Sequence, residues 1–166
     1  TAQDELRMVM NGLYFDLKED YMAIVASDGH KLVRNRIYGC KTEVPASFIL
    51  PKKPATLLRT VLANDGSDVT IRFNQSNAEV VYNDGMLCCR LIEGKYPNYN
   101  SVIPQDNPNR LTIDRKALIS ALRRVMPFAS ESTQLVKLRI EFNSLEINSE
   151  DIEFATSARE SVVCEY

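Results

Sequence analysis

The sequence has no tryptophan, a single histidine and only four cysteines among its 166 residues. None of the cysteines belongs to a Cys-x-x-Cys pair, the usual spacing of zinc-binding and redox-active cysteines. We therefore predict no metal site and no cofactor. The cysteines are expected to be reduced and mostly to pack against other residues, and they are Cys40, Cys88, Cys89 and Cys164.

Long apolar runs and a large charge of one sign are also absent. No run approaches the roughly 18 residues of a membrane span, and the first residues, Thr1-Ala2-Gln3-Asp4-Glu5, show no signal-peptide pattern. We therefore expect a cytoplasmic protein without membrane contact. The formal charge of −2 excludes a protein that grips nucleic acid over its whole surface, so any DNA contact must come from a local basic patch.

Short apolar segments between turn residues predict an α+β fold. Strands are expected over residues 6–17, 21–27, 31–38, 48–50, 69–73, 78–82 and 86–92. A helix is expected over residues 53–62. Its residues Leu57, Leu58, Val61 and Leu62 have the spacing of one buried face.

The order strand, helix, three strands then returns. Strands are expected over residues 111–113, 136–142, 145–148 and 152–156, and a helix over 115–126 with Asp114 as its N-cap. Leu58 corresponds to Leu122, an offset of 122 − 58 = 64 residues, which indicates an internal repeat. Because each repeat has one face to bury, sheets should lie on one side and helices on the other. The proline-rich stretch 104–109 is a candidate linker.

Basic side chains gather on the outward faces of both expected helices. On the first helix Arg59 points outward, and Lys52 and Lys53 lie at the helix start. On the second helix Lys116, Arg123 and Arg124 lie opposite the apolar stripe. A helix start with adjacent lysines attracts phosphate, although a merely solvated face is the alternative. The sequence has neither aromatic residues interleaved with these basic ones nor a recognition-helix motif, the two patterns that would indicate contact with DNA bases.

The only histidine, His30, follows the tight-turn signal Asp28-Gly29. This turn would present His30 and Lys31 at a sheet edge, which is a suitable place for a binding surface. Ser27, Asp28 and His30 cannot form a catalytic triad, because neighbours on one turn cannot adopt that geometry. A small hydrolase or transferase with Asp28 and His30 as an acid/base pair is a weak alternative, since no nucleophile, glycine-rich phosphate loop or metal cluster accompanies them.

Three stretches resemble a known family. They are Ser27-Asp28-Gly29-His30-Lys31-Leu32, Leu50-Pro51-Lys52-Lys53 and Glu93-Gly94-Lys95-Tyr96-Pro97-Asn98-Tyr99. All three closely resemble the beta subunit of bacterial DNA polymerase III, a DNA sliding clamp. The resemblance implies the clamp fold, with antiparallel sheets outside and helices facing a DNA-sized hole in a ring of two subunits. It also implies that residues 1–107 are a middle clamp domain without its first strand and helix, and residues 108–166 the first half of a C-terminal clamp domain.

The function implied by this resemblance is that of a non-catalytic processivity factor in the bacterial cytoplasm. Its implied partners are duplex DNA of any sequence, the DNA polymerase III catalytic subunit, the clamp loader, other proteins with a clamp-binding motif, and a second subunit in a homodimer ring. A β-rich protein-interaction module without DNA contact is the remaining alternative.

The same resemblance assigns residues to three surfaces. The partner-motif pocket comprises Arg7, Met10, Ser27, Gly29, His30, Lys31, Leu32, Pro97 and Val102. The DNA-facing residues are Arg7, Lys52, Lys53, Arg59, Lys116, Arg123 and Arg124. The subunit interface includes Phe128 and Ala129.

Overall fold

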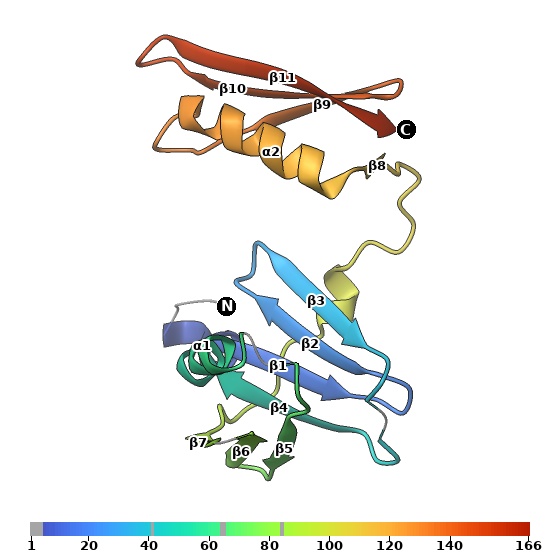
Figure 1. Cartoon of the computed structure of the whole chain (residues 1–166), viewed down its shortest axis with the longest axis vertical. Helices are drawn as coiled ribbons and strands as arrows, with labels where there is room; N and C mark the ends of the chain where they lie inside the picture. The colour runs from blue at the N-terminus through green and yellow to red at the C-terminus, as the bar shows by residue number, and fades with distance from the viewer. Residues whose placement is uncertain (1–4, 41, 64–65, 84) are drawn as a thin grey trace. The chain divides into compact units, whose positions relative to one another are not determined.

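The structure, a computed structural model, describes residues 5–40, 42–63, 66–83 and 85–166. The chain divides into two compact units, residues 1–103 and 104–166 (Figure 1). Each unit has hydrophobic clusters of its own, and none of these clusters combines residues of both units.

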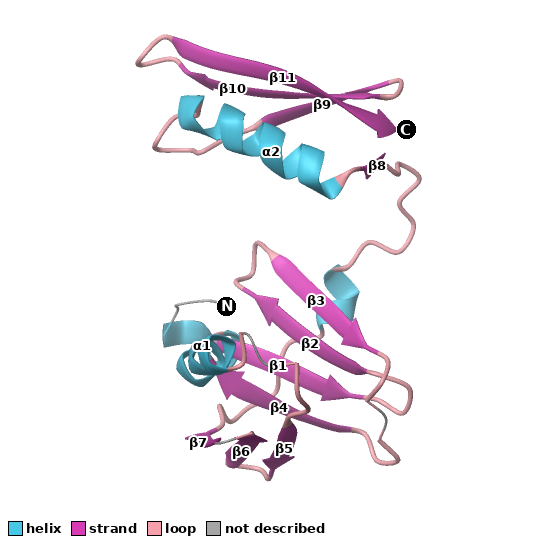
Figure 2. Cartoon of the chain, in the orientation of Figure 1, coloured by secondary structure: helices cyan, strands magenta, loops and turns pink. Residues whose placement is uncertain are grey.

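The first unit is built on a four-stranded antiparallel sheet in the order β3-β2-β1-β4. Its elements are the 3-10 helix η1 (Glu5–Met10) and the strands β1 (Gly12–Leu17), β2 (Met22–Ser27), β3 (Leu32–Ile37) and β4 (Ala46–Pro51). A second group of elements follows, comprising α1 (Lys52–Val61), β5 (Thr70–Phe73), β6 (Asn77–Tyr82), β7 (Gly85–Arg90) and the 3-10 helix η2 (Tyr99–Val102) (Figure 2). The strands β5, β6 and β7 form a three-stranded antiparallel sheet.

Both faces of the four-stranded sheet are covered, because alternate residues of a strand point to opposite sides. On one face Phe15 stacks on Phe48 with ring centroids 4.6 Å apart, and Leu58 of α1 packs against this cluster. On the other face Val25 and Ile49 pack against Tyr96 and Tyr99. The segment that carries the two tyrosines therefore lies across the sheet face opposite α1.

The second unit is a four-stranded antiparallel sheet with one helix on it, in the order β8-β11-β10-β9. Its elements are β8 (Thr112–Ile113), α2 (Arg115–Val125), the 3-10 helix η3 (Met126–Phe128), β9 (Lys137–Glu141), β10 (Ser144–Asp151) and β11 (Thr156–Glu165). Ala121 and Val125 of α2 are buried against Leu145 and Ile147 of β10. Figure 2 shows α2 running along one face of this sheet.

The expected repeat is confirmed, since β4-α1-β5-β6-β7 and β8-α2-β9-β10-β11 have the same order. The expected N-cap of α2 is confirmed as well, because the carboxylate of Asp114 accepts a hydrogen bond of 2.8 Å from the Ala117 N–H. No described helix combines the length and the apolar character that crossing a bilayer requires.

Two strand predictions were wrong in part. Residues 6–10 belong to η1 rather than to a strand, because β1 pairs with β4 only from Gly12, opposite Pro51, where β4 ends and α1 begins. Residues 152–155 form a turn, and the last strand is β11. Asp151 explains this turn, since its carboxylate accepts hydrogen bonds of 2.9 and 3.2 Å from the N–H groups of Glu153 and Phe154.

Two burial predictions were also wrong in part. Leu57 and Val61 of α1 are 49% and 47% exposed, since only Ala55 and Leu58 of this helix pack against the core. The cysteines are free thiols, but Cys40 and Cys88 are exposed and Cys164 alone is buried. The sequence also predicts turns over residues 64–66 and 83–85, and their residues Asn64, Asp65 and Asp84 lie outside the described residues.

Candidate functional site

A pocket of about 320 Å³ opens in the first unit between η1, the β2–β3 turn and the segment from Tyr96 to Val102. Its lining residues are Arg7, Met10, Ser27, Gly29, His30, Lys31, Leu32, Tyr96, Pro97, Asn98, Tyr99 and Val102. All nine residues assigned to the partner-motif pocket from the sequence line this one cavity, together with Tyr96, Asn98 and Tyr99. We call it the His30 pocket.

The β2–β3 turn that forms one wall is held by the Asp28 carboxylate. One of its oxygens accepts hydrogen bonds from the N–H groups of His30 at 3.0 Å and Lys31 at 2.8 Å. These bonds hold the pKa of Asp28 below its ordinary value, the one from Lys31 having the larger effect. The turn is therefore fixed locally, and His30 and Lys31 are presented with exposed side chains.

Gly29 lets η1 approach this turn closely. Its φ of +90° is a conformation that favours glycine, and a Cβ atom there would lie 2.5 Å from Nη1 of Arg7. Glycine therefore allows both the backbone conformation of the turn and the close approach of the Arg7 guanidinium. This approach places a cation at the rim of the pocket.

The opposite wall is anchored by two buried tyrosines. Tyr96 stacks on Tyr14 of β1, with ring centroids 4.6 Å apart and planes 3° from parallel. The hydroxyl of Tyr99 donates a 2.8 Å hydrogen bond to the buried carboxylate of Asp16, whose other oxygen lies 3.0 Å from Nζ of Lys18. Burial, followed by the interaction with Asp16, raises the pKa of Tyr99 to about 12. Pro97 and Val102 are thus carried by a segment tied firmly to the sheet.

Sequence reasoning missed these anchors in part. Tyr96 and Tyr99 belong to a stretch that carries the family resemblance, and this stretch could have indicated that they help to form the pocket. The role of Asp16 had no signal, because its partner Tyr99 lies 83 residues away along the chain.

The chemistry of the His30 pocket suits a short peptide. Met10 is buried and Leu32 half-buried, while Val102 is 67% exposed and free to meet a ligand. Cationic side chains of Arg7 and Lys31 stand at the rim, where a peptide carbonyl or carboxylate can pair with them. An apolar slot with a few polar groups at its edge holds an apolar anchor and fixes its orientation.

The same geometry argues against an Asp28–His30 acid/base pair. The carboxylate of Asp28 is occupied by backbone N–H groups, and its second oxygen lies 3.7 Å from Nζ of Lys31. It is therefore engaged in holding the turn rather than in orienting the imidazole. Across the described ranges, no group of three or more His, Cys, Asp or Glu side chains could hold a metal ion.

Six of the seven basic residues predicted to face DNA lie exposed on α1 and α2, whereas the seventh, Arg7, lies in η1 and lines the His30 pocket. Lys52 and Lys53 are the first residues of α1, whose N-cap Pro51 supplies no side-chain hydrogen bond. Lys52 and Arg59 are seven positions apart and so share one face of α1. Lys116 and Arg123 occupy the equivalent positions of α2, each offset by 64 residues. The repeat therefore preserves a pair of cations on each helix.

Arg124 differs from its neighbours because it is already paired. Its guanidinium makes two hydrogen bonds to the Glu160 carboxylate of β11, one of them 2.9 Å long. These bonds raise the pKa of Arg124 and lower that of Glu160. Of the predicted cations of α2, Lys116 and Arg123 are therefore more available to phosphate than Arg124 is.

The predicted interface residues Phe128 and Ala129 follow α2. Phe128, in η3, is 41% exposed, and the neighbouring Met126 is 51% exposed.

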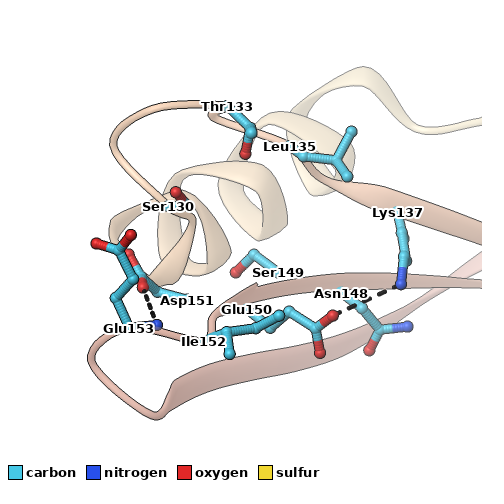
Figure 3. A pocket seen from close by; sticks show the side chains of 10 residues that line it. All are labelled: Ser130, Thr133, Leu135, Lys137, Asn148, Ser149, Glu150, Asp151, Ile152 and Glu153. Atoms are coloured by element: carbon cyan, nitrogen blue, oxygen red, sulfur yellow. Dashed lines mark hydrogen bonds and ion pairs between the residues drawn. The ribbon is translucent and has the colours of Figure 1, made fainter.

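A second pocket, also of about 320 Å³, lies in the same unit at the β10–β11 turn (Figure 3). Leu135 and Ile152 contribute apolar surface to it, and a 3.6 Å ion pair joins Lys137 to Glu150 at its edge.

Comparison with known protein families identifies the fold. Residues 1–98 match the central domain of the DNA polymerase III beta subunit, and residues 100–166 match its C-terminal domain. The chain belongs to the DNA polymerase III beta subunit family. The clamp fold inferred from the sequence is thereby confirmed.

Curated relatives in this family are named beta sliding clamp. That of Borreliella burgdorferi is 33% identical over 138 residues, which cover 80% of this chain and 34% of the relative. That of Caulobacter vibrioides is 28% identical over 170 residues, covering 99% of this chain and 45% of the relative. The chain thus spans less than half the length of these sliding clamps.

Solved structures of the family superpose closely on the chain. The DNA polymerase III beta subunit of Thermotoga maritima has a TM-score of 0.83 at 28% identity, covering 99% of this chain and 45% of its own. The griselimycin-bound sliding clamp of Bartonella birtlesii has a TM-score of 0.84 at 25% identity, with the same coverage. The Pseudomonas aeruginosa subunit reaches 0.90 at 24% identity, covering 100% and 46% of the two chains.

Proposed function

We propose that this chain is part of a sliding clamp, a non-catalytic processivity factor that encircles duplex DNA in the bacterial cytoplasm. In this proposal, residues 1–107 are most of a middle domain and residues 108–166 the first half of a C-terminal domain. The His30 pocket takes the linear motifs of the replicative polymerase, the clamp loader and other clamp-binding proteins. Phe128 and Ala129 contribute to the contact with a second subunit in a homodimer ring.

One observation carries the partner-binding part of this proposal. Nine residues assigned from the sequence, from Arg7 to Val102, line one cavity of about 320 Å³ with apolar walls and a cationic rim. A cavity of this size and character accommodates one or two apolar side chains of a peptide in extended form.

A titration of labelled Gln-Leu-Ser-Leu-Phe peptide tests the pocket. Truncation of Leu32 or Pro97 to alanine removes apolar lining and should weaken binding about tenfold, as truncation of buried anchors commonly does. Val33→Ala is the matched control, because Val33 is the next residue of β3 but is 68% exposed and does not line the pocket. Saturable binding that Val33→Ala weakens as much as Leu32→Ala would contradict the assignment.

A second candidate function, a β-rich interaction module without DNA contact, keeps the pocket but assigns no role to the basic helix faces. The repetition of two exposed cations at equivalent positions of α1 and α2 favours the clamp. Sequence-independent DNA binding that depends on these cations separates the two candidates.

A further inference from the structure

One lining residue of the His30 pocket keeps a polar group without a partner. Tyr96, Asn98 and Tyr99 line the pocket in addition to the residues that the family resemblance assigns. The side-chain oxygen of Asn98 accepts a 3.2 Å hydrogen bond from the Asn100 N–H, and the Tyr99 hydroxyl donates to Asp16. The hydroxyl of Tyr96 is buried and makes no hydrogen bond within the part of the chain that the structure describes.

The first unit itself encloses this hydroxyl. Tyr96 is 7% exposed and belongs to the hydrophobic cluster that also contains Val25 and Ile49. Its ring is held in place by stacking on Tyr14, with ring centroids 4.6 Å apart. The lack of an acceptor is therefore set by the packing inside this unit and does not depend on what covers the surface of the unit.

The position of Ser27 places the Tyr96 hydroxyl beside the His30 pocket. Burial raises the pKa of Tyr96, and the Ser27 N–H, which approaches the phenol oxygen, partly offsets this rise. Ser27 lines the His30 pocket, whereas Tyr14, which stacks on the Tyr96 ring, does not. The approach of Ser27 falls short of a hydrogen bond, and an N–H group can only donate. The hydroxyl therefore still needs an acceptor, which a ligand in this pocket is placed to supply.

The wall beside the hydroxyl can move without breaking the sheet. Val25, opposite Tyr14, is the last residue of β2 that pairs with β1, so Ser27 lies beyond this pairing. On its other side Ser27 pairs with Leu32 of β3, and the β2–β3 turn joins the two strands. The end of this hairpin can therefore shift as a unit. Such a shift would let a ligand reach the hydroxyl, which the empty pocket keeps enclosed.

We propose that Tyr96 is a ligand-binding residue of the His30 pocket and that its hydroxyl donates a hydrogen bond to a main-chain carbonyl of the bound peptide. The inference rests on the proposed function, in which the ligand is a short peptide. An extended peptide presents a carbonyl at every residue, and a neutral phenol is a suitable donor in an apolar site. The cationic side chains of Arg7 and Lys31, at the rim, suit a carboxylate better.

One substitution should change stability and affinity in different ways. Tyr96→Phe keeps the ring and its stacking and removes only a hydroxyl that has no acceptor in the unliganded chain. A buried polar group without a partner costs stability, so this variant should unfold at the same denaturant concentration as the unaltered chain or at a higher one. It should bind the peptide about tenfold more weakly, because the ligand carbonyl then lacks its donor.

A titration of labelled Gln-Leu-Ser-Leu-Phe peptide and a denaturant unfolding curve, both on the full 166-residue chain, test these effects. Tyr38→Phe is the control, because Tyr38 is 64% exposed and does not line the pocket. It should change neither measurement. Tyr99→Phe provides the contrast, because its hydroxyl has an acceptor in Asp16 and its loss should lower stability as well as affinity.

The possible results separate this inference from the proposed function. Peptide binding that Leu32→Ala weakens but Tyr96→Phe leaves unchanged would overturn the inference alone. A Tyr96→Phe variant that unfolds at a lower denaturant concentration than the unaltered chain would also overturn it, because the hydroxyl would then have an acceptor in the unliganded chain. Peptide binding that is absent, or that Leu32→Ala leaves unchanged, would remove the proposed function of the pocket and this inference with it.

Discussion

At the scale of single residues, the His30 pocket depends on a hydrogen bond beneath its wall rather than on its lining alone. Tyr99 donates to Asp16, and this bond ties η2, with Pro97 before it and Val102 within it, to β1. The bond is buried, so water cannot readily replace it. The pocket's shape should therefore be sensitive to a hydroxyl group that the ligand need not touch.

We expect Tyr99→Phe to lower the free energy of unfolding by about 1 kcal/mol and to weaken motif-peptide binding a few-fold. The pH dependence of stability shows whether the hydrogen bond from Tyr99 to Asp16 causes this effect. The pKa of Tyr99 is raised to about 12 from an ordinary value of 10.0, so the folded state keeps the proton that the unfolded state loses. The stabilisation is complete below about pH 10 and is lost as the pH rises towards about 12.

Denaturant titrations between about pH 8 and pH 12 measure this effect. Part of the alkaline loss of stability expected of the unaltered chain should be missing in Tyr99→Phe. Tyr38→Phe is the control, because Tyr38 is 64% exposed and lies outside the pocket. Identical alkaline profiles for the unaltered chain and Tyr99→Phe would show that Asp16 does not hold the phenol in its protonated form.

At the scale of elements, the two helices of the repeat begin differently. Asp114 caps α2 with a side-chain hydrogen bond, whereas Pro51 at the same position of α1 gives none. The only hydrophobic cluster described in the second unit depends on α2, through Ala121 and Val125. Loss of the cap should therefore affect the second unit alone.

We expect Asp114→Ala to destabilise the second unit by about 1 kcal/mol, the usual cost of losing a capping oxygen. Amide hydrogen exchange should become faster along α2, most clearly at Ala117, and should be unchanged in β1 and β2 of the first unit. Asp114→Ser restores a capping oxygen and should recover most of the loss. Equal destabilisation by alanine and serine would show that the cap itself is not what stabilises α2.

Most elements could be predicted from the sequence, because period, turn residues and capping are local properties. The helix of the second repeat and its cap at Asp114 are examples. The extent of burial could not be predicted in the same way. Leu57 and Val61 have the spacing of a buried helix face, yet they are about half exposed. The periodicity shows which face of the helix is apolar, but it does not show whether another element packs on that face.

The candidate pocket, too, could be predicted from the sequence only in part. The turn at Asp28-Gly29 could be found locally, and the family resemblance supplied the other lining residues. Resemblance did not reveal the contact of Arg7 with Gly29 or the bond of Tyr99 to Asp16, since each joins residues far apart in the chain. The strand β11 was missed because the Asp151 turn delays its start beyond the apolar residues Ile152 and Phe154.

At the scale of the whole molecule, the 64-residue repeat duplicates both a fold and a charge pattern. Lys52 and Arg59 of α1 correspond to Lys116 and Arg123 of α2, and all four side chains are exposed. The formal charge of the chain is only −2, so these cations are a local feature and not a consequence of composition. A surface that binds phosphate without reading bases needs no more than such repeated cations.

Salt dependence measures how many of these cations bind DNA phosphates. The slope of the logarithm of the binding constant against that of the salt concentration becomes shallower by about 0.9 for each phosphate that the protein no longer neutralises. Replacing Lys52 and Arg59 by alanine should reduce the slope by about 2, and replacing Lys116 and Arg123 should have a similar effect. Arg72→Ala is the control, because Arg72 is paired with Glu79 on β6. If both double variants keep the slope of the unaltered chain, these four cations belong to solvated helix faces and do not bind DNA phosphates.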